Sequence, residues 1–435
     1  MSTELKDATA APSPWEQATL FINGKKVEWR AELVLLREQE YEVTVEAPPE
    51  IARALNLGLA DNGALETVAS PEFGAWVAPA NGKFTWKITP DAGKSGRITL
   101  VFFSREVLVP WEHRSLVISS NLADEADVKI NGVDVPAGGN WFFWDKPQTV
   151  TLTPKPGSPL AGLPVTLTCA IKSGLRPLVV SQPQFGSEQT RYSWAVGGYS
   201  GSGTFQLTLS GKGMTTPITL AVSKLLSNNL ADEVDVMIDG KEASDAEVVY
   251  LRNAKHKITL APKLNSPLAG YPLSLQWIRG DGVVPVDLTF QPQLDTETDV
   301  HSWDVTGSAT EAGTFELGIV GAGFNAPMIL PVSRQISAKY FLDGKEFSGF
   351  KDVVNGRMYR FHVEVLGGIS RVHVENSPGE LGFNPPLNRW FDLSSGGVTW
   401  GFTPNVNDFV TETVRFNYSS VYFARDTISF AIAPT

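Results

Sequence analysis

Two stretches of the sequence repeat one another at a fixed distance, and this repeat limits the possible folds more than any other feature. NLADEADVKING starts at Asn121, and NLADEVDVMIDG starts 108 residues later at Asn229. SPLAGLPVTLT, from Ser158, returns as SPLAGYPLSLQ from Ser266 after the same interval. A period of this length is typical of a self-contained domain, because solenoid units span only roughly 20 to 50 residues.

Fainter copies of the unit flank this pair, so that the 435 residues divide into four units with boundaries near Val117, Leu225 and Arg334. An apolar residue, then Asn or Asp, then Gly occurs at Ile22-Asn23-Gly24, Ile130-Asn131-Gly132, Ile238-Asp239-Gly240 and Leu342-Asp343-Gly344. A tryptophan recurs late in each unit, at Trp86, Trp194, Trp303 and Trp400. The start is small, polar and proline-punctuated, which predicts a flexible leader over residues 1–17. The predicted domains cover residues 18–117, 118–225, 226–334 and 335–435.

Apolar and polar residues alternate over short runs such as TVTLTP and TFQLTLS, which indicates half-buried β-strands. Gly, Pro, Asn and Asp separate the runs, including Asn-Gly at Asn81 and Asn131, a dipeptide that favours tight hairpin turns. About seven short strands in about 100 residues predict an immunoglobulin-like β-sandwich. The sequence therefore predicts an all-β tandem array of four such domains, with the recurring tryptophans between their sheets.

The entry segments SPLAGLPVTLT and SPLAGYPLSLQ resemble those of the bacterial immunoglobulin-like tandem repeat proteins of the Big or invasin type. The resemblance covers the chain from about Ala18 onward. It implies domains that act as spacers or interaction modules on extracellular or cell-surface proteins, without a catalytic motif. The N-terminus lacks the basic start and apolar segment of a classical secretory signal, so a cytoplasmic location stays open.

Charge and composition exclude several other classes of protein. With 36 basic and 47 acidic residues the net charge is -11, which disfavours a nucleic-acid partner. The sequence has no run of eighteen apolar residues, so membrane insertion is not expected. Cys169 is the single cysteine, which excludes an internal disulfide and favours a role as a small buried apolar residue.

The search for catalytic motifs predicts a non-enzymatic protein without a cofactor. DAGKSG from Asp91 resembles the end of a phosphate-binding loop, but Ile88 stands where that loop needs a glycine. The five histidines form neither HxH nor HExxH, and no serine lies in a GxSxG motif.

Acidic segments at the first two junctions are candidate calcium sites, because clusters of carboxylate oxygens can bind Ca²⁺ and stiffen a rod of domains. The alternative interpretation is an exposed polar linker, and the third junction, SRQISAKYFLDG, lacks the cluster. The candidate ligands are Asp124, Glu125 and Asp127, repeated as Asp232, Glu233 and Asp235.

Two aromatic segments are candidate ligand-binding surfaces. NWFFWDKP, from Asn140, could present Trp141 and Trp144 to a sugar or a partner, although alternation also fits a strand with rings in the core. NSPGELGFNPPLNRWF, from Asn376, departs from the repeat and makes Arg389 and Trp390 candidates in the fourth domain.

Two hypotheses follow for the function. The first is a non-enzymatic, elongated, adhesin-like interaction protein whose repeats act as spacers and present recognition loops to a protein or glycan partner. The second is a ligand-recognition protein, such as the carbohydrate- or host-receptor-binding part of a toxin or phage-like particle.

Overall fold

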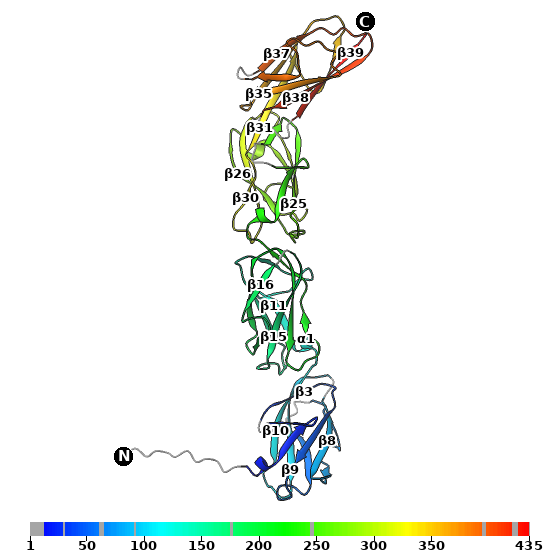
Figure 1. The fold of residues 1–435 in the computed structure, drawn as a ribbon, viewed down its shortest axis with the longest axis vertical. Coiled ribbons are helices and arrows are strands. Elements are labelled where there is room, and N and C mark those ends of the chain that lie inside the picture. Colours follow the sequence, from blue (N-terminus) through cyan, green and yellow to red (C-terminus); the bar gives the residue numbers. More distant parts are fainter. Residues whose placement is uncertain are drawn as a thin grey trace, which may run out of the picture.

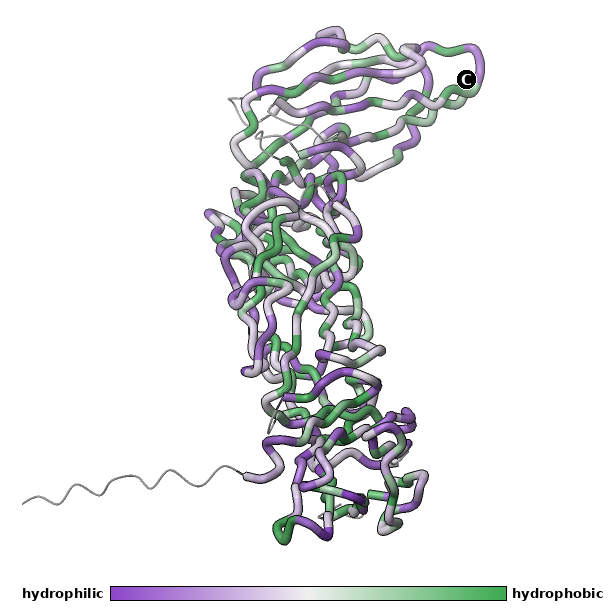
Figure 2. The backbone as a smooth tube through the Cα atoms, turned by 60° about the horizontal axis from the view of Figure 1, so that its bottom comes forward, coloured by the Kyte–Doolittle hydropathy of each residue, from purple (hydrophilic) through white to green (hydrophobic). Residues whose placement is uncertain are grey.

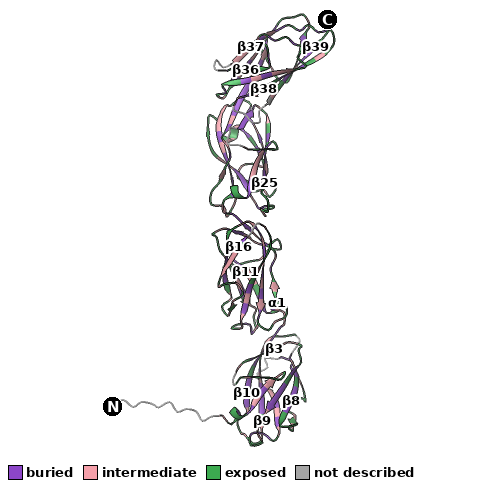
Figure 3. Cartoon of the chain, viewed as in Figure 1, coloured by how far each residue is buried: buried purple, intermediate pink, exposed green. Residues whose placement is uncertain are grey.

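The computed structural model describes residues 13–28, 31–60, 65–90, 93–174, 177–243, 248–393, 397–419 and 425–434. These residues form four β-sandwiches arranged in single file, and the sandwich nearest the C-terminus is tilted against the others (Figure 1). Hydrophobic and hydrophilic residues alternate along the strands (Figure 2), and the buried residues follow the interior of each sandwich (Figure 3). The prediction of an all-β tandem array of immunoglobulin-like domains is confirmed.

Domain 1 begins earlier than the sequence predicts. The short helix η1 (Pro14–Gln17) places Trp15 in the core, and the indole N–H donates to the carbonyl oxygen of Val109 at 2.8 Å. The predicted leader is therefore wrong for residues 14–17, and residues 1–12 lie outside the described part. One sheet has the order β2 (Lys25–Lys26), β1 (Thr19–Ile22), β4 (Tyr41–Glu46), β8 (Lys83–Thr89) and β6 (Val68–Ser70). The other has β3 (Leu33–Leu36), β10 (Trp111–Ile118), β9 (Gly96–Ser104), β5 (Leu55–Ala60) and β7 (Trp76–Val77).

Domain 2 repeats this arrangement after the one-turn helix α1 (Leu122–Glu125), which the side chain of Asn121 caps. One sheet has the order β12 (Val133–Asp134), β11 (Ala126–Ile130), β14 (Gln148–Pro154), β18 (Ser193–Ser200) and β16 (Leu178–Gln182). The other has β13 (Trp141–Phe143), β21 (Ser223–Leu226), β19 (Gly203–Gly211), β15 (Val165–Gly174) and β17 (Glu188–Gln189), with β20 (Ile218–Thr219) beside β19.

Domain 3 follows the short helix η2 (Leu230–Asp232). One sheet has the order β23 (Lys241–Glu242), β22 (Val234–Ile238), β25 (Lys255–Pro262), β28 (Ser302–Thr306) and β27 (Thr289–Gln291). The other contains β24 (Val248–Leu251), β31 (Ser333–Leu342), β29 (Gly313–Val320) and β26 (Ser274–Asp281), with β30 (Met328–Ile329) beside β29, and η3 (Pro285–Asp287) connects β26 to β27.

Domain 4 shares strand β31 with domain 3. The first residues of β31 pair with β29, and Ser337 to Leu342 pair with β34 of domain 4. The predicted boundary after Arg334 therefore falls inside a continuous strand. The first sheet contains β32 (Lys345–Phe347), β31, β34 (Tyr359–Leu366) and β37 (Gly397–Phe402). The second has the order β33 (Phe350–Val354), β39 (Arg425–Ala433), β38 (Val410–Tyr418), β35 (Arg371–Ser377) and β36 (Arg389–Asp392).

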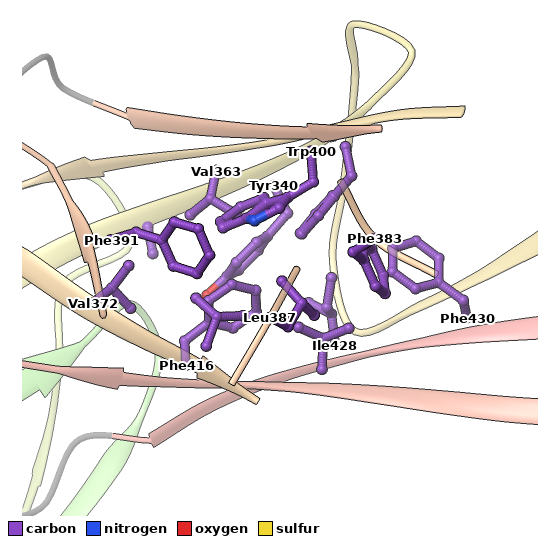
Figure 4. Close-up of a cluster of buried hydrophobic side chains, with 14 of the residues drawn as sticks. Tyr340, Val363, Val372, Phe383, Leu387, Phe391, Trp400, Phe416, Ile428 and Phe430 are labelled. Carbon is purple, nitrogen blue, oxygen red and sulfur yellow. The ribbon is translucent and has the colours of Figure 1, made fainter. Parts of the chain in front are cut away.

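The four sandwiches share one register, which explains the repeated sequence landmarks. In each domain a short strand runs parallel to the last strand, as β3 does to β10. The tryptophans face the same neighbouring strand and are fully buried, as Figure 4 shows for Trp400 among the aromatic rings of domain 4. Their Cα partners are Val43 for Trp86, Val150 for Trp194, Ile258 for Trp303 and Phe361 for Trp400.

Candidate functional site

The acidic segment at the first junction is a hydrogen-bonded clasp. Glu125 is 1% exposed, and its Oε1 accepts the backbone N–H of Ser119 at 2.7 Å and the hydroxyl of Ser95 from domain 1. Its Oε2 accepts the hydroxyl of Ser158 at 2.6 Å. Because these donors come from both domains, Glu125 ties the end of domain 1 to the start of domain 2.

The other two acidic residues of this segment form ion pairs at the surface. Asp124 accepts the Arg37 guanidinium of domain 1 at 3.2 Å and the Ser119 hydroxyl at 2.6 Å. Asp127 lies 3.8 Å from the ammonium of Lys155. Exposed pairs of this kind contribute little stability, so the buried carboxylate of Glu125 carries the junction.

The second junction repeats the clasp except for one bond, because Oε2 of Glu233 and the hydroxyl of Ser266, the counterpart of Ser158, have no partner among the described residues. Glu233 is fully buried and accepts the backbone N–H of Ser227 at 2.6 Å and the hydroxyl of Ser202 from domain 2. Asp232 accepts the Ser227 hydroxyl at 2.7 Å, and Asp235 lies 3.6 Å from the ammonium of Lys263.

Calcium at these two segments stays a prediction. Among the residues that the structure describes, no group of three or more His, Cys, Asp or Glu side chains could hold a metal ion. Both carboxylate oxygens of Glu125 instead accept protein N–H and O–H groups, and so does Oε1 of Glu233, whereas Oε2 of Glu233 has no hydrogen-bond partner among the described residues.

The aromatic segment of domain 2 lies at the seam with domain 3. Phe143 packs edge-on against Tyr271 and Phe324 of domain 3, with ring centroids 5.5 and 5.2 Å apart. Trp141 packs against the same Tyr271 at 4.9 Å, under the ammonium of Lys224 at 4.0 Å. The two domains therefore share an aromatic cluster that stabilises their relative orientation.

Trp144 lies beside this seam and is held by its own domain. Its indole N–H donates to the carbonyl oxygen of Gly201 at 3.2 Å. Trp141 and Trp144 both remain partly exposed. The structure gives Trp141 a packing role, and ligand binding by either side chain stays a prediction.

Arg389 and Trp390 lie on β36, the edge strand of the second sheet of domain 4. Trp390 is 51% exposed and its ring is 5.3 Å from that of His373 on β35. His373 is in turn 3.2 Å from the carboxylate of Glu375. The Arg389 guanidinium covers the ring of Phe391 at 5.0 Å. An exposed indole beside charged and hydrogen-bonding side chains is suited to contact a sugar or a protein loop.

A buried carboxylate that the sequence analysis missed fixes the loop before β36. Glu412 is fully buried and accepts the backbone N–H of Gly379 and of Glu380, each at 2.9 Å, and the amide of Asn376 at 2.5 Å. The signal in the sequence is a glutamate in register with the core residues Val414 and Phe416. Such a carboxylate preorganises the loop, because bonds from N–H groups to a charged acceptor are strong.

The single cysteine, Cys169, is unreactive because of its surroundings. Burial raises the pKa of the Cys169 thiol to about 11, so the thiol stays protonated and unreactive at neutral pH. Two grooves of about 620 and 510 Å³ recur at equivalent places in domains 2 and 3. Apolar and charged side chains line both of them, Leu220 with Asp127 in the first and Leu330 with Asp235 in the second.

The sequence and the structure were compared with those of known proteins. No family model and no curated protein matches the sequence. Among solved structures, the chain is similar to FdeC, an adhesin of Escherichia coli, with 12% identity over 72% of this chain and 96% of that one and a TM-score of 0.33. It is also similar to invasin, titled a bacterial integrin-binding protein, with 10% identity over 95% of this chain and 79% of that one and a TM-score of 0.29. For the Yersinia pseudotuberculosis adhesin InvE the identity is 16% over 42% of this chain and 56% of that one, with a TM-score of 0.17.

The chain's own sheets and junctions define it as a tandem immunoglobulin-like β-sandwich protein, the class that its repeats resemble. In the described part of the chain, no helix is long and apolar enough to cross a membrane.

Proposed function

We propose that the protein is a non-enzymatic, adhesin-like interaction protein of the cell surface or extracellular space. Its domains hold a contact surface on domain 4, centred on Arg389 and Trp390, at a distance from domain 1. Two of the bacterial proteins named above, FdeC and InvE, are adhesins. The proposal for this chain is carried by its own geometry.

One observation carries the proposal: domain 4 is fixed to a single-file array by the continuous strand β31. Leu251 of domain 3 and Ile336 of β31 pack in the hydrophobic cluster of domain 4, so the two domains share one core. A shared strand and core hold the Trp390 surface, on the last domain of the rod, in a constant orientation, which suits presentation to a partner.

The test measures binding to a printed array of glycans and extracellular proteins and compares the intact wild-type chain with the variant Trp390→Ala. We expect this variant to lose at least about tenfold in affinity for the bound probe, as truncation of an aromatic anchor does. Trp76→Ala is the matched control, because Trp76 of domain 1 is also exposed, at 44% against 51%.

Two outcomes would contradict the proposal. Binding that survives Trp390→Ala and is lost in the control would place the contact surface on domain 1. Cleavage of an arrayed glycan by the wild-type chain would show that the protein is an enzyme.

A further inference from the structure

The three junctions cover the same two positions of each sandwich. The first position is the final residue of the short strand that runs parallel to the last strand of the domain. The second position is the residue of that last strand with which it pairs. Both side chains pack on the core of the following domain, not only on their own. The pairs are Leu36 with Ile118, Phe143 with Leu226 and Leu251 with Ile336.

Domain 4 has the same pair in the same register, and there the pair faces solvent. Val354 ends β33 and is the Cα partner of Ala433 on β39. Val354 is 59% exposed, and Ala433 is exposed as well. Domain 4 thus has the same pair of residues that contacts the following domain at each of the three junctions.

The loop that follows this position points to the same use. In domains 1 to 3 it carries a basic side chain that bonds to the following domain. In domain 4 the basic residue of this loop, Arg357, instead pairs with Asp343 of its own domain at 3.0 Å, and the loop also carries Met358, which is 75% exposed. The three basic contacts are Arg37 to Asp124 at 3.2 Å, Lys146 to the carbonyl oxygen of Gly323 at 2.7 Å and Arg252 to Glu346 at 3.1 Å.

A second loop completes the surface. In domains 1 to 3 the loop after the tryptophan strand supplies a serine that bonds to the junction, namely Ser95, Ser202 and Ser308. In domain 4 this loop carries Phe409, which is 66% exposed. It is bonded to the first loop through Asn355 and Val406 at 3.0 Å. We call Val354, Met358 and Phe409 the end face of domain 4.

The opposite end of domain 1 offers the matching half of a junction. In domains 2 and 3 the loop before the last strand receives the preceding linker, through Thr215 N–H to the Ser120 carbonyl at 3.0 Å and Asn325 N–H to the Asn228 carbonyl at 2.8 Å. The same loop of domain 1, which joins β9 to β10, carries Leu108, which is 101% exposed, and Val109, which is 70% exposed. We call these two residues the base of domain 1.

We propose that the end face of domain 4 docks the base of domain 1 of a second copy of this chain, so that the protein associates end to end. The two surfaces occupy positions equivalent to those that form the junctions inside the chain, so the contact would reproduce the interface between neighbouring domains. Exposed apolar side chains gathered at such positions favour association, because their burial removes apolar surface from water. A head-to-tail contact of this kind does not close on itself and produces open strings.

The experiment is sedimentation of the full 435-residue chain from about 1 µM to about 1 mM. We expect the weight-average mass to rise with concentration above the 47.2 kDa of one copy. The end-face variant is Val354→Asp with Phe409→Asp, and the base variant is Leu108→Asp with Val109→Asp. Each should raise the dissociation constant at least about tenfold. Val133→Asp, on the edge strand β12 of domain 2 and 68% exposed, is the matched control that should associate like the wild type.

The two variants in one mixture give the sharpest test, because each keeps the surface that the other has lost. Their equimolar mixture should stop at one-to-one pairs, while each variant alone stays monomeric. A wild-type chain that remains monomeric throughout would overturn the proposal. A base variant that still dimerises alone would also overturn it, because end faces would then dock to one another.

Discussion

A single turn residue explains the most widely repeated motif of the sequence. Asn131 adopts a positive φ of 51°, and its side-chain oxygen accepts the backbone N–H of Thr149 on the neighbouring strand at 2.8 Å. Asn23, Asp239 and Asp343 have the same conformation and bond in the same way at 2.8 to 2.9 Å. The motif needs Asn or Asp because these residues tolerate the left-handed region and carry an acceptor at the right reach.

Asn131→Ala should weaken this hairpin by about 1–2 kcal/mol, because alanine disfavours the left-handed conformation and leaves the Thr149 N–H without its acceptor. The measurement is hydrogen exchange of β14, which we expect to accelerate roughly 5- to 30-fold. Asn131→Asp keeps the acceptor and is the control. Equal effects of the two substitutions would contradict this explanation.

His113 should make domain 1 sensitive to mild acid. The side chain is 2% exposed, neither ring nitrogen has a hydrogen-bond partner among the described residues, and burial lowers the pKa of the imidazole. The unfolded chain, with an ordinary histidine pKa of about 6.5, then takes up the proton at higher pH than the folded one. The stabilisation by neutral His113 is complete above about pH 6.5 and is lost as the pH falls from there toward the lower folded value.

The measurement is hydrogen exchange of β10 between about pH 7 and about pH 5, corrected for the intrinsic exchange rate. We expect exchange to accelerate as the pH falls in the wild type and to change little in His113→Phe, which has no proton to gain. The same pH dependence in both proteins would contradict the assignment to His113.

Among the elements, the one-turn helix α1 stabilises the first junction through the carboxylate of Glu125 at its end. Glu125→Ala should leave the Ser119 N–H and two serine hydroxyls at the junction without an acceptor, at a cost of about 2–3 kcal/mol. We expect exchange over residues 119–126 to accelerate at least roughly tenfold. Asp127→Ala is the control in the same segment, because the Asp127 carboxylate is exposed and pairs only with Lys155. An equal response of the two variants would contradict the clasp.

The same segment tests the calcium prediction directly. The oxygens of Glu125 already accept protein donors, so we expect exchange over residues 119–126 to be unchanged by a calcium chelator. Slower exchange on adding calcium would instead support the site predicted from the acidic pattern.

The elements and their order could be predicted from the sequence because their signals are local. Alternation marks the strands and Asn-Gly marks the turns, and both extend over only a few residues. The contacts between domains could not be predicted in this way, because the residues that form them lie far apart in the sequence. Phe143 of domain 2 and Phe324 of domain 3, for example, pack against each other. Two features of the sequence do indicate structure that the sequence analysis missed, namely the continuous strand β31 and the helix η1. The run from Ser333 to Leu342 contains no Gly, Pro or Asn, as a continuous strand requires, and Pro14 to Gln17 precede β1 at the same 108-residue offset as the helix α1.

At the scale of the molecule, the domains are joined by two kinds of junction that should differ in stiffness. A clasped turn joins domain 1 to domain 2 and domain 2 to domain 3, whereas a hydrogen-bonded strand and a shared core join domain 3 to domain 4. A continuous strand with a shared core resists bending more than a turn does, so we expect the third junction to be the stiffest. The part of the molecule that carries Trp390 is therefore the part held most firmly.

Small-angle scattering of the dilute chain tests this shape. Four sandwiches in single file, each about 33 Å long for strands of ten residues, give a rod of about 130 Å and a radius of gyration of about 40 Å. A compact protein of this length would give roughly 22 Å. Phe143→Ala should loosen the second junction by removing its central ring, which lowers the mean radius and broadens the distribution of distances. Ala338→Gly, a small change within the ladder of β31, should leave both unchanged. A wild-type radius near the compact value would contradict the single-file arrangement, and a rod indifferent to Phe143→Ala would show that the clasp alone holds that junction.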